Sequence, residues 1–498
     1  MEVSRPAQRA GPGAESKRDK TLEPETEEVQ VKLKRYSWLI LLIVFALAAA
    51  ACGGDGDEET TTTAGGGEET TTTAGPEETT TSEAMAEVAT DIGVDPETHT
   101  ITLGLLADLT GIFSPLVIDI VDAQQVYWDD VVNAAGGVGG EWQVEVLVED
   151  TNYNVEQHGE KYETLRDQVV AFTQSTGSPT TVSILDKIKE DNVLVIPLSW
   201  YSGWAIPEFD GGLVLEQGTN YCIEAMNILG FINEMGGTKL ALATFPGDYG
   251  QDAAAGVKIA ADYYGIEIVY DGEGAVIPGQ DQTPVIQAIA GSGADWTFLT
   301  TNPSTGAEIM GGAAQAGYAG AWTGSVPTYD FRLLDTPLAP LLSAAYYQSG
   351  YSVTWGTDIP GMQPMYDAMI AAKPDARPSD AFLIGWNEAK SMHQILELAL
   401  QNGDLTRQGV IDAAQSIPVI DLEGTAPNQT YAGTPNEYVV RQSVMLKPNS
   451  ELYTAAGGAE QTIGQEGGGT TGSEVAKDFF ASEAAMDFEF SAPCYALQ

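Results

Sequence analysis

The sequence predicts an α/β protein whose main body consists of two similar lobes. From residue 101 onward, short apolar runs alternate with amphipathic stretches, the pattern of strands joined by helices in a parallel sheet. The same alternation starts again near residue 220. The body extends from about residue 100 to residue 498, which is more chain than one hydrophobic core usually holds. We therefore expect one sheet in each lobe.

The elements of the first half follow from their apolar patterns. The run 101–106 has only one strongly polar residue, Thr102, so it predicts a buried strand. The other expected strands are 143–149 and 193–196, and the expected helices are 116–133, 155–173 and 181–190. Each helix is long enough to bridge two parallel strands, which predicts βαβ units.

The second half repeats this arrangement. A helix at 221–235 is expected to stop at Gly236 and Gly237, because glycine readily takes the left-handed conformation that ends helices. Strands are then expected at 239–244, 266–270 and 296–301, and helices at 250–264, 282–290 and 306–317. After residues 346–355, helices are expected at 364–372, 380–402 and 406–416, and a last extended pair is expected near 437–446.

The beginning of the chain indicates export. A polar extension of uncertain status, 1–31, precedes a predicted signal peptide at 32–51 that has a cationic start and an apolar middle. The apolar part, 38–51, is shorter than the ~20 residues that a membrane-spanning helix needs. Small residues then lead to Cys52, as in a bacterial lipobox, although Ala49 stands where lipoboxes usually have Leu. We predict lipid attachment at Cys52; the alternative is an ordinary secretory signal with a chance cysteine.

A Thr/Glu/Gly-rich segment, 52–99, separates the signal from the body. It repeats the motif Glu-Glu-Thr-Thr-Thr-Thr-Ala-Gly at 58–65 and 68–75. Because it has few apolar residues, it cannot offset the entropy lost on ordering, and we expect a disordered tether. The whole chain has a formal net charge of −49, spread along its length. Such acidity disfavours nucleic acid and anionic lipid as partners and indicates a strongly solvated surface.

Two cysteines remain if Cys52 takes lipid. Cys222 and Cys494 are disulfide candidates, because exported chains meet oxidising conditions. The bond would connect the C-terminal tail to the start of the second lobe. The alternative is two separate buried thiols.

No set of residues predicts catalysis. His99, His158 and His393 stand in polar or helical contexts that favour structural or solvated roles. The sequence has no nucleophile elbow, phosphate loop or paired cysteine motif. We therefore expect a protein that is not an enzyme and that needs neither cofactor nor metal.

Polar and aromatic residues gather instead at strand ends, where open α/β sheets bind ligands. Hydroxyls and free N–H groups in the turn 175–180 suit a carboxylate, although simple helix capping by Ser178 or Thr180 explains them equally well. Four aromatic residues are candidates for an apolar wall or for plain core packing: Trp200, Tyr201, Tyr221 and Tyr249. An ammonium group would need a carboxylate, and Asp108 and Asp330 are the candidates, with turn formation as the alternative.

These strand ends, in this order, resemble the Leu/Ile/Val-type periplasmic binding proteins of ABC importers. The resemblance runs from about residue 101 to residue 446. It is carried by Leu-Thr-Gly at 109–111, Asn-Ala-Ala-Gly-Gly-Val-Gly-Gly at 133–140, Glu-Asp at 149–150, the turn 175–180 and Tyr-Gly at 249–250. The long glycine-rich turn is the most specific of these motifs.

The resemblance implies the type I periplasmic binding fold, in which two Rossmann-like lobes joined by three crossings close on a small ligand. It implies lobes at 100–218 with 356–430 and at 219–345 with 431–498. Carried over, Ser175, Thr176 and Ser178 resemble the carboxylate-binding loop, Ser199, Trp200 and Tyr201 a second ligand-binding segment, Tyr249 the far-lobe aromatic and Asp330 the second-lobe acid.

The implied function is capture of a small amphipathic solute for ABC permease subunits, from a lipid anchor on the outer face of the cell membrane. Two departures bear on the ligand: Phe113-Ser-Pro follows the first Thr-Gly, and Trp200 and Tyr201 are bulky where amino-acid binders are small. The ligand is therefore expected to be a branched-chain amino acid or an amide, urea-like or aromatic relative. The alternative function is a ligand-sensing extracellular receptor domain for a signalling partner.

Overall fold

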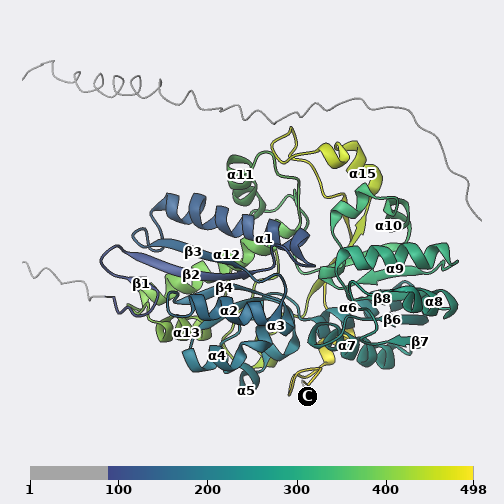
Figure 1. Cartoon of the computed structure of the whole chain (residues 1–498), viewed down its shortest axis with the longest axis horizontal. Helices are drawn as coiled ribbons and strands as arrows, with labels where there is room; N and C mark the ends of the chain where they lie inside the picture. The colour runs from purple at the N-terminus through teal and green to yellow at the C-terminus, as the bar shows by residue number, and fades with distance from the viewer. Residues whose placement is uncertain (1–87, 497–498) are drawn as a thin grey trace, which may run out of the picture. The chain divides into compact units, whose positions relative to one another are not determined.

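The computed structural model describes residues 88–496. The predicted extension, the signal peptide, most of the tether and Cys52 lie outside the described residues. Within the described range, the chain forms two α/β lobes, each built on one sheet (Figure 1). This confirms the predicted fold class.

The first lobe is built on a sheet of five strands. They are β1 (Val94–Asp95), β2 (Thr100–Ala107), β3 (Gln143–Asp150), β4 (Ala171–Thr176) and β5 (Leu194–Leu198). Strands β3, β2, β4 and β5 are parallel, and the short β1 pairs antiparallel with β2. The helices of this region are α1 (Ser114–Val126), α2 (Val155–Leu165), α3 (Ser178–Ser183), α4 (Leu185–Asp191) and α5 (Pro207–Asp210).

The second lobe is built on a sheet of seven strands in the order β12-β11-β10-β9-β8-β6-β7. Their bounds are β6 (Lys239–Ala243), β7 (Glu267–Gly272), β8 (Trp296–Leu299), β9 (Ala321–Gly324), β10 (Tyr346–Gly350), β11 (Ser443–Pro448) and β12 (Ser473–Phe480). The helices around them are α6 (Tyr221–Glu234), α7 (Asp248–Tyr264), α8 (Thr283–Gly291), α9 (Pro303–Gln315), α10 (Ala339–Ala345), α14 (Pro435–Tyr438), α15 (Ser450–Ala455) and α16 (Glu483–Asp487). Strands β6 to β10 are parallel, whereas β11 and β12 add an antiparallel edge.

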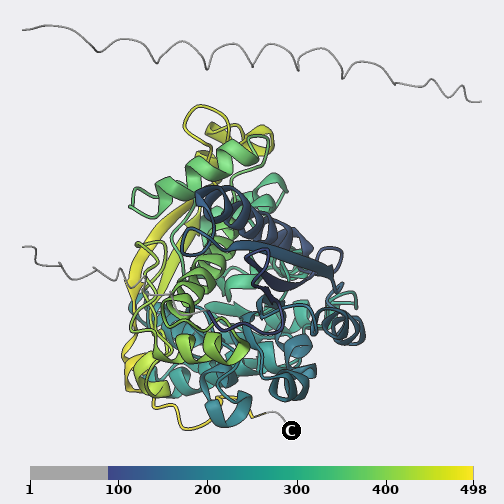
Figure 2. The ribbon, with the colours of Figure 1, turned by 90° about the vertical axis from the view of Figure 1, so that its left-hand side faces the viewer.

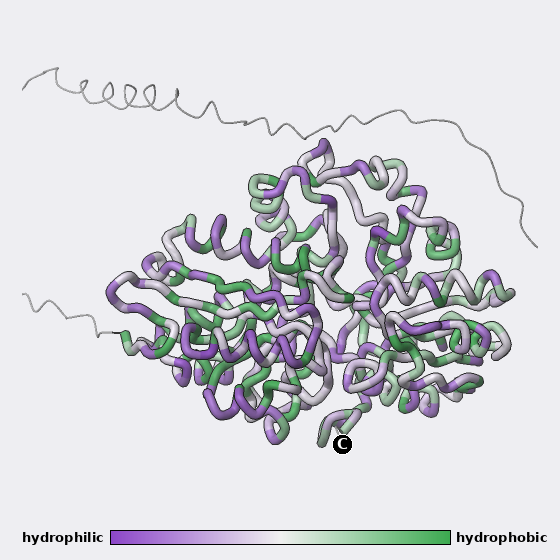
Figure 3. Tube along the Cα trace, viewed as in Figure 1, coloured by the Kyte–Doolittle hydropathy of each residue, from purple (hydrophilic) through white to green (hydrophobic). Residues whose placement is uncertain are grey.

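The chain passes between the lobes three times, as predicted. It leaves the first lobe after β5, returns after β10 and leaves again before β11. The returning segment forms α11 (Met362–Ala372), α12 (Ala381–Gln401) and α13 (Arg407–Ser416), whose apolar faces belong to the core of the first lobe. In Figure 3 the apolar segments gather inside both lobes, and hydrophilic segments predominate along the outer helices.

A late segment of the chain also comes back to α11. Figure 2 shows the loop after α15 beside α11, at one end of the molecule. The backbone N–H of Ile463 donates to the carbonyl of Ala376, and the indole of Trp355 donates to the carbonyl of Gly468 at 3.0 Å. The C-terminal part of the chain is therefore integrated into the fold.

The structure corrects the helix expected at 155–173. Helix α2 ends at Leu165, and residues 171–176 form β4 in the middle of the first sheet. The apolar run 169–172 is buried on all sides, and such a run looks the same in a central parallel strand as in a buried helix.

Three further strands were not expected. Strand β9 is short, and β12 is an edge strand rich in charged residues, so neither has an apolar pattern. Residues 94–95, expected in the tether, pair with β2, and Val94 is buried against the core of the first lobe. No helix within residues 88–496 is long and apolar enough to cross a membrane.

Candidate functional site

A cavity lies between the two lobes, beyond the carboxyl ends of β4 and β5 on one side and of β9 and β10 on the other. The space between its walls, together with the opening to solvent, is about 960 Å³. The first lobe and its returning helices contribute Phe113, Leu116, Val117, Ile120, Tyr153, Thr176, Gly177, Leu198, Trp200, Ser379, Asp380, Ala381 and Ile384. The second lobe and the adjoining crossings contribute Tyr221, Tyr249, Val326, Pro327, Tyr329, Asp330, Phe331, Gln348, Ser349, Gly350, Tyr351, Ser352, Val353 and Leu446.

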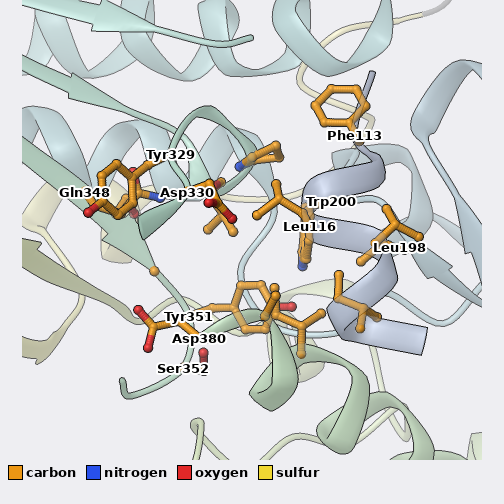
Figure 4. Close-up of a pocket in the computed structure, with 18 of the residues that line it drawn as sticks. Phe113, Leu116, Leu198, Trp200, Tyr329, Asp330, Gln348, Tyr351, Ser352 and Asp380 are labelled. Carbon is orange, nitrogen blue, oxygen red and sulfur yellow. Dashed lines mark hydrogen bonds between the residues drawn. The ribbon is translucent and has the colours of Figure 1, made fainter. Parts of the chain in front are cut away.

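The acidic and amide side chains of this lining lie on one side of the cavity. In Figure 4, Phe113, Leu198 and Trp200 lie on one side, whereas Asp330, Gln348 and Asp380 lie on the other. The lining contains no Lys, Arg or His among the residues that the structure describes. The cavity thus offers a large apolar surface with a polar end of acidic character, which suits an amphipathic ligand.

Asp330 is buried at the polar end. Its carboxylate accepts a hydrogen bond from the backbone N–H of Arg332 at 2.8 Å and from the guanidinium of the same residue at 2.9 Å. Burial raises the pKa of Asp330 to about 6, and the charge of Arg332 opposes that rise. Arg332 also reaches the first lobe, where its guanidinium donates to Asp119 of α1 at 2.7 Å.

Asp380 is the second acid of the polar end. It precedes α12 and accepts from the backbone N–H of Trp355 at 2.8 Å and from the hydroxyls of Thr471 and Ser473 at 3.1 and 3.3 Å. Burial raises the pKa of Asp380 to about 6, whereas these three hydrogen bonds lower it. All three donors are neutral, so they solvate the carboxylate without balancing its charge.

Two neutral side chains complete the polar end. The hydroxyl of Tyr329 is buried and has no hydrogen-bond partner within residues 88–496. The amide of Gln348 donates to the carbonyl of Val326 at 3.0 Å, and its oxygen accepts from Tyr346 at 2.6 Å. Tyr329 therefore has hydrogen-bonding capacity left for a ligand.

Five of the predicted binding residues line the cavity: Thr176, Trp200, Tyr221, Tyr249 and Asp330. Trp200 is held in place by its indole N–H, which donates to the carbonyl of Gln217 at 2.7 Å. The rings of Tyr221 and Tyr249 lie 4.6 Å apart, and the hydroxyl of Tyr249 bonds to Ser325 at 2.7 Å. These contacts hold the aromatic wall before any ligand arrives.

The other four predicted residues do not line the cavity, and their hydroxyls bind other groups of the protein. Ser175 contacts His158 at 3.0 Å and Thr181 at 2.8 Å. Ser178 and Ser199 bond to each other at 2.6 Å. Tyr201 donates to the carbonyl of Tyr495 at 2.7 Å. Within the described chain, these groups stabilise the loop after β4 and the C-terminal tail.

Asp108, the other carboxylate considered for an ammonium group, forms a turn. It accepts from the backbone N–H groups of Gly111 at 2.6 Å and Phe113 at 2.8 Å. This turn sets the start of α1 and so places Phe113 in the lining.

Sequence reasoning missed several lining residues. Gln348 and Tyr351 stand at the end of β10, and the strand-end rule would have found them if that strand had been delimited. Tyr329 and Asp380 carried no such signal, because they stand in loops between helices. Only the fold brings these loops to the same place.

The histidines and cysteines have structural surroundings. Burial lowers the pKa of His158 to about 3, so its ring is neutral beside Ser175. Cys222 and Cys494, the pair that the sequence predicts, form a disulfide that joins the C-terminal tail to α6. Within residues 88–496, no cluster of side chains is suited to hold a metal ion.

Comparison with known proteins identifies the family. The family of periplasmic binding proteins matches residues 100–443. The chain therefore belongs to this family, and it is a solute-binding protein of an ABC transporter. It is a binding protein rather than an enzyme. Comparison with curated protein sequences gives no match.

Solved structures with the same fold come from several bacteria. A fatty acid ABC transporter substrate-binding protein from Thermomonospora curvata is 26% identical with a TM-score of 0.70, covering 80% of this chain and 97% of its own. A branched-chain amino acid ABC transporter protein from Thermus thermophilus with bound valine is 17% identical, with a TM-score of 0.63 and coverage of 79% and 98%. A solute-binding protein from Rhodopseudomonas palustris in complex with p-hydroxybenzoic acid is 15% identical, with a TM-score of 0.60 and coverage of 77% and 97%.

Proposed function

We propose that this protein captures a small amphipathic solute by closing its two lobes around it and presents the solute to permease subunits in the membrane. The single observation that supports this best is the cavity itself, because both lobes supply its walls. A ligand that contacts both lobes favours the closed arrangement by its differential affinity for the two states.

Hydrogen bonds between the two lobes support the proposal that the lobes close around the ligand. Arg332 of the second lobe donates to Asp119 and, at 3.0 Å, to the carbonyl of Pro115, both in α1 of the first lobe. Asn302 donates to the carbonyl of Ile112 at 3.4 Å. An opened protein would lose these contacts, so they contribute to the stability of the closed form.

The solute has a larger apolar part than a urea or a short amide. The apolar side of the cavity is formed by bulky residues such as Phe113, Leu198 and Trp200. The three related proteins are a fatty acid substrate-binding protein, a protein with bound valine and a protein in complex with p-hydroxybenzoic acid, and each of these ligands has an apolar body with a polar end. Branched-chain and aromatic amino acids and their amide or amine relatives are therefore the compounds to test first.

We also propose that the protein works from the outer face of the cell membrane, anchored by lipid on Cys52. The cationic start, short apolar stretch and small residues before that cysteine support this. The tether then keeps the binding body free to diffuse close to the permease.

Ligand-dependent thermal unfolding tests the binding function. A panel of branched-chain and aromatic amino acids, amides, amines and carboxylates is added in turn to the purified body. A compound present at about 100 times its Kd stabilises the folded state by about 2.7 kcal/mol, which raises the Tm by several degrees. Small-angle scattering with that compound should show a more compact protein than scattering without it. If no compound in the panel raises the Tm, the proposed function fails.

A further inference from the structure

The polar end of the cavity has an excess of negative charge. Within residues 88–496, Asp330 has one ionic partner, Arg332, and it shares this partner with Asp119. The three side chains together have two carboxylates and one guanidinium. Asp380 forms no salt bridge within residues 88–496. A buried carboxylate without a counter-charge is costly, and a cation delivered by the ligand would reduce that cost.

An uncommitted polar group stands beside these acids. The hydroxyl of Tyr329, a residue only 7% exposed, has no partner in the described part of the chain. Its oxygen is able to accept a hydrogen bond from an ammonium group. A buried, unpaired acceptor in a cavity wall normally receives its partner from the ligand or from water.

The rest of the wall is rich in aromatic rings. They belong to Phe113, Tyr153, Trp200, Tyr221, Tyr249, Tyr329, Phe331 and Tyr351. Aromatic faces attract cations, with a contribution of about 0.5–2 kcal/mol for a well-placed ring. The same rings accept an apolar body, so the wall suits an organic cation along its whole length.

The cavity offers no comparable binding site for a free carboxylate. Of the three residues that the resemblance assigns to a carboxylate, Ser175 and Ser178 do not line the cavity, and their hydroxyls are bonded within the protein. The hydroxyl of Thr176, which does line the cavity, accepts from the amide of Gln174 at 2.8 Å. Asp330 and Asp380 would repel a carboxylate at the polar end. The described lining residues include no base, and the guanidinium of Arg332 behind Asp330 is already shared between Asp330 and Asp119.

We propose that the solute of this cavity is an apolar amine, with an aromatic or branched aliphatic body, an ammonium group and no carboxylate. This rests on the proposed function and narrows its ligand. The ammonium group lies at the polar end, which Asp330, Asp380 and Tyr329 line, while the body extends toward Trp200 and Phe113.

Calorimetry with compounds of matched shape tests this assignment. The first series is 2-phenylethylamine, 2-phenylethanol, 3-phenylpropionate and phenylalanine, and the second is isoamylamine, 4-methylpentanoate and leucine. We expect at least one amine to bind tenfold or more tightly than the matched carboxylate and amino acid. A carboxylate or amino acid that binds more tightly than its amine overturns the inference and leaves the proposed function standing.

Variants of the two acids test whether their charge, rather than the shape of the cavity, determines the affinity for the amine. In Asp380→Asn we expect the affinity for the amine to fall tenfold or more and that for 2-phenylethanol to change less than threefold. Asp380 also accepts a hydrogen bond from the backbone of Trp355, so its substitution could disturb the fold locally. Asp330→Asn is therefore measured in parallel, and the Tm of each variant without ligand shows whether it is folded. Asp335→Asn is the matched control, since Asp335 pairs with Arg377 at 2.9 Å and does not line the cavity.

The two proposals fail in different ways. If neither amine binds, the inference is overturned, whatever the wider panel shows. If an amine binds and both acid variants bind it as tightly as the unmodified protein, the assigned ammonium position is wrong. Failure of every compound in the wider panel is the separate result that counts against solute capture itself.

Discussion

At the scale of single residues, the site depends on which polar groups are already satisfied. Sequence reasoning chose Ser175, Ser178 and Ser199 because hydroxyls at strand ends suit ligands, but the structure pairs them with other protein groups. Asp330 and Asp380 are buried at the cavity wall instead, where desolvation raises the pKa of both to about 6. Their ionisation therefore falls within an accessible pH range.

We expect the affinity for an apolar amine to rise between about pH 5 and about pH 7.5. Asp330 and Asp380 lose their protons near pH 6, whereas the ammonium group, like that of Lys, stays charged well above this range. The increase should be about three- to tenfold if one carboxylate dominates. Calorimetry at several pH values measures it, and the neutral 2-phenylethanol should show no such rise.

The other ionisable groups near the cavity do not reverse the expected rise of amine affinity with pH. Glu224 and Glu388 are buried, and burial raises the pKa of both, that of Glu224 to about 8. Burial also raises the pKa of Asp119, which would add negative charge as the pH rises. An amine affinity that falls with pH over this range would contradict the assignment.

The unliganded protein should respond to pH in the opposite direction. Between about pH 4 and pH 6, folded Asp330 and Asp380 retain protons that the unfolded chain, with a pKa of 3.8, has already released. Folding stability therefore decreases as the pH rises through this window, because charging these buried acids costs free energy. A bound amine should reduce this loss of folding stability, because its positive charge compensates the charge of the buried acids.

At the scale of elements, the one-residue connection between β4 and α3 lies against an aromatic residue of the cavity wall. Gly177 has a φ of +96° and lines the cavity beside Tyr153. A Cβ at this glycine would stand 2.5 Å from the ring of Tyr153 and 2.7 Å from the hydroxyl of Thr180. Only glycine suits both the backbone conformation and the space.

We predict that Gly177→Ala destabilises the protein by about 1–3 kcal/mol and weakens ligand binding, because Tyr153 has to move. Urea unfolding measures the first effect and calorimetry the second. Gly291→Ala is the control, because that glycine has an ordinary φ and no atom within 4 Å of the added Cβ. Equal stability of Gly177→Ala and the control would refute the strain argument.

At the scale of the whole molecule, the C-terminal tail is attached to the start of α6 by the disulfide between Cys222 and Cys494, 272 residues apart in sequence. The tail also bonds to the first lobe, since Tyr201 donates to the carbonyl of Tyr495 and the N–H of Cys494 donates to Ser202 at 2.8 Å. The tail therefore connects parts of both lobes.

Removing the disulfide in a Cys222→Ala, Cys494→Ala double variant should lower the stability by about 2–4 kcal/mol, since a long loop is released in the unfolded chain. The Tm of the unmodified protein with and without reductant gives the same comparison. The double variant supplies the control, because reductant should leave its Tm unchanged. A reductant effect of equal size in both proteins would rule out the disulfide as its cause.

Cys52→Ala tests the anchor in cells. We expect the unmodified protein in the membrane fraction and labelled by a radioactive fatty acid, and the variant unlabelled and released. The purified binding body should melt at the same temperature in either case, because Cys52 lies outside the described fold. Retention of the variant in the membrane fraction would show that another segment holds the protein there.

Much of the fold was predictable because it depends on local patterns. Apolar runs predicted β2, β3 and β5 and most second-lobe strands, and the spacing between them predicted βαβ units in two lobes. The motifs at 133–140 and 175–180 pointed to the family that the comparison confirms. Where the pattern was ambiguous, as in the buried β4, or weak, as in the charged edge strand β12, the prediction was wrong or missing.

The sequence by itself determined the fold class, the family and the strand ends from which a site is built, because these follow from short-range periodicity and turn chemistry. Only the tertiary structure decided which of those residues face the cavity. Tyr329, Gln348 and Asp380 stand far along the chain from Trp200, and they share one cavity because three crossings bring their loops together. Whether a hydroxyl or carboxylate is left for a ligand depends on which partners the folded chain supplies, and sequence order does not contain that information.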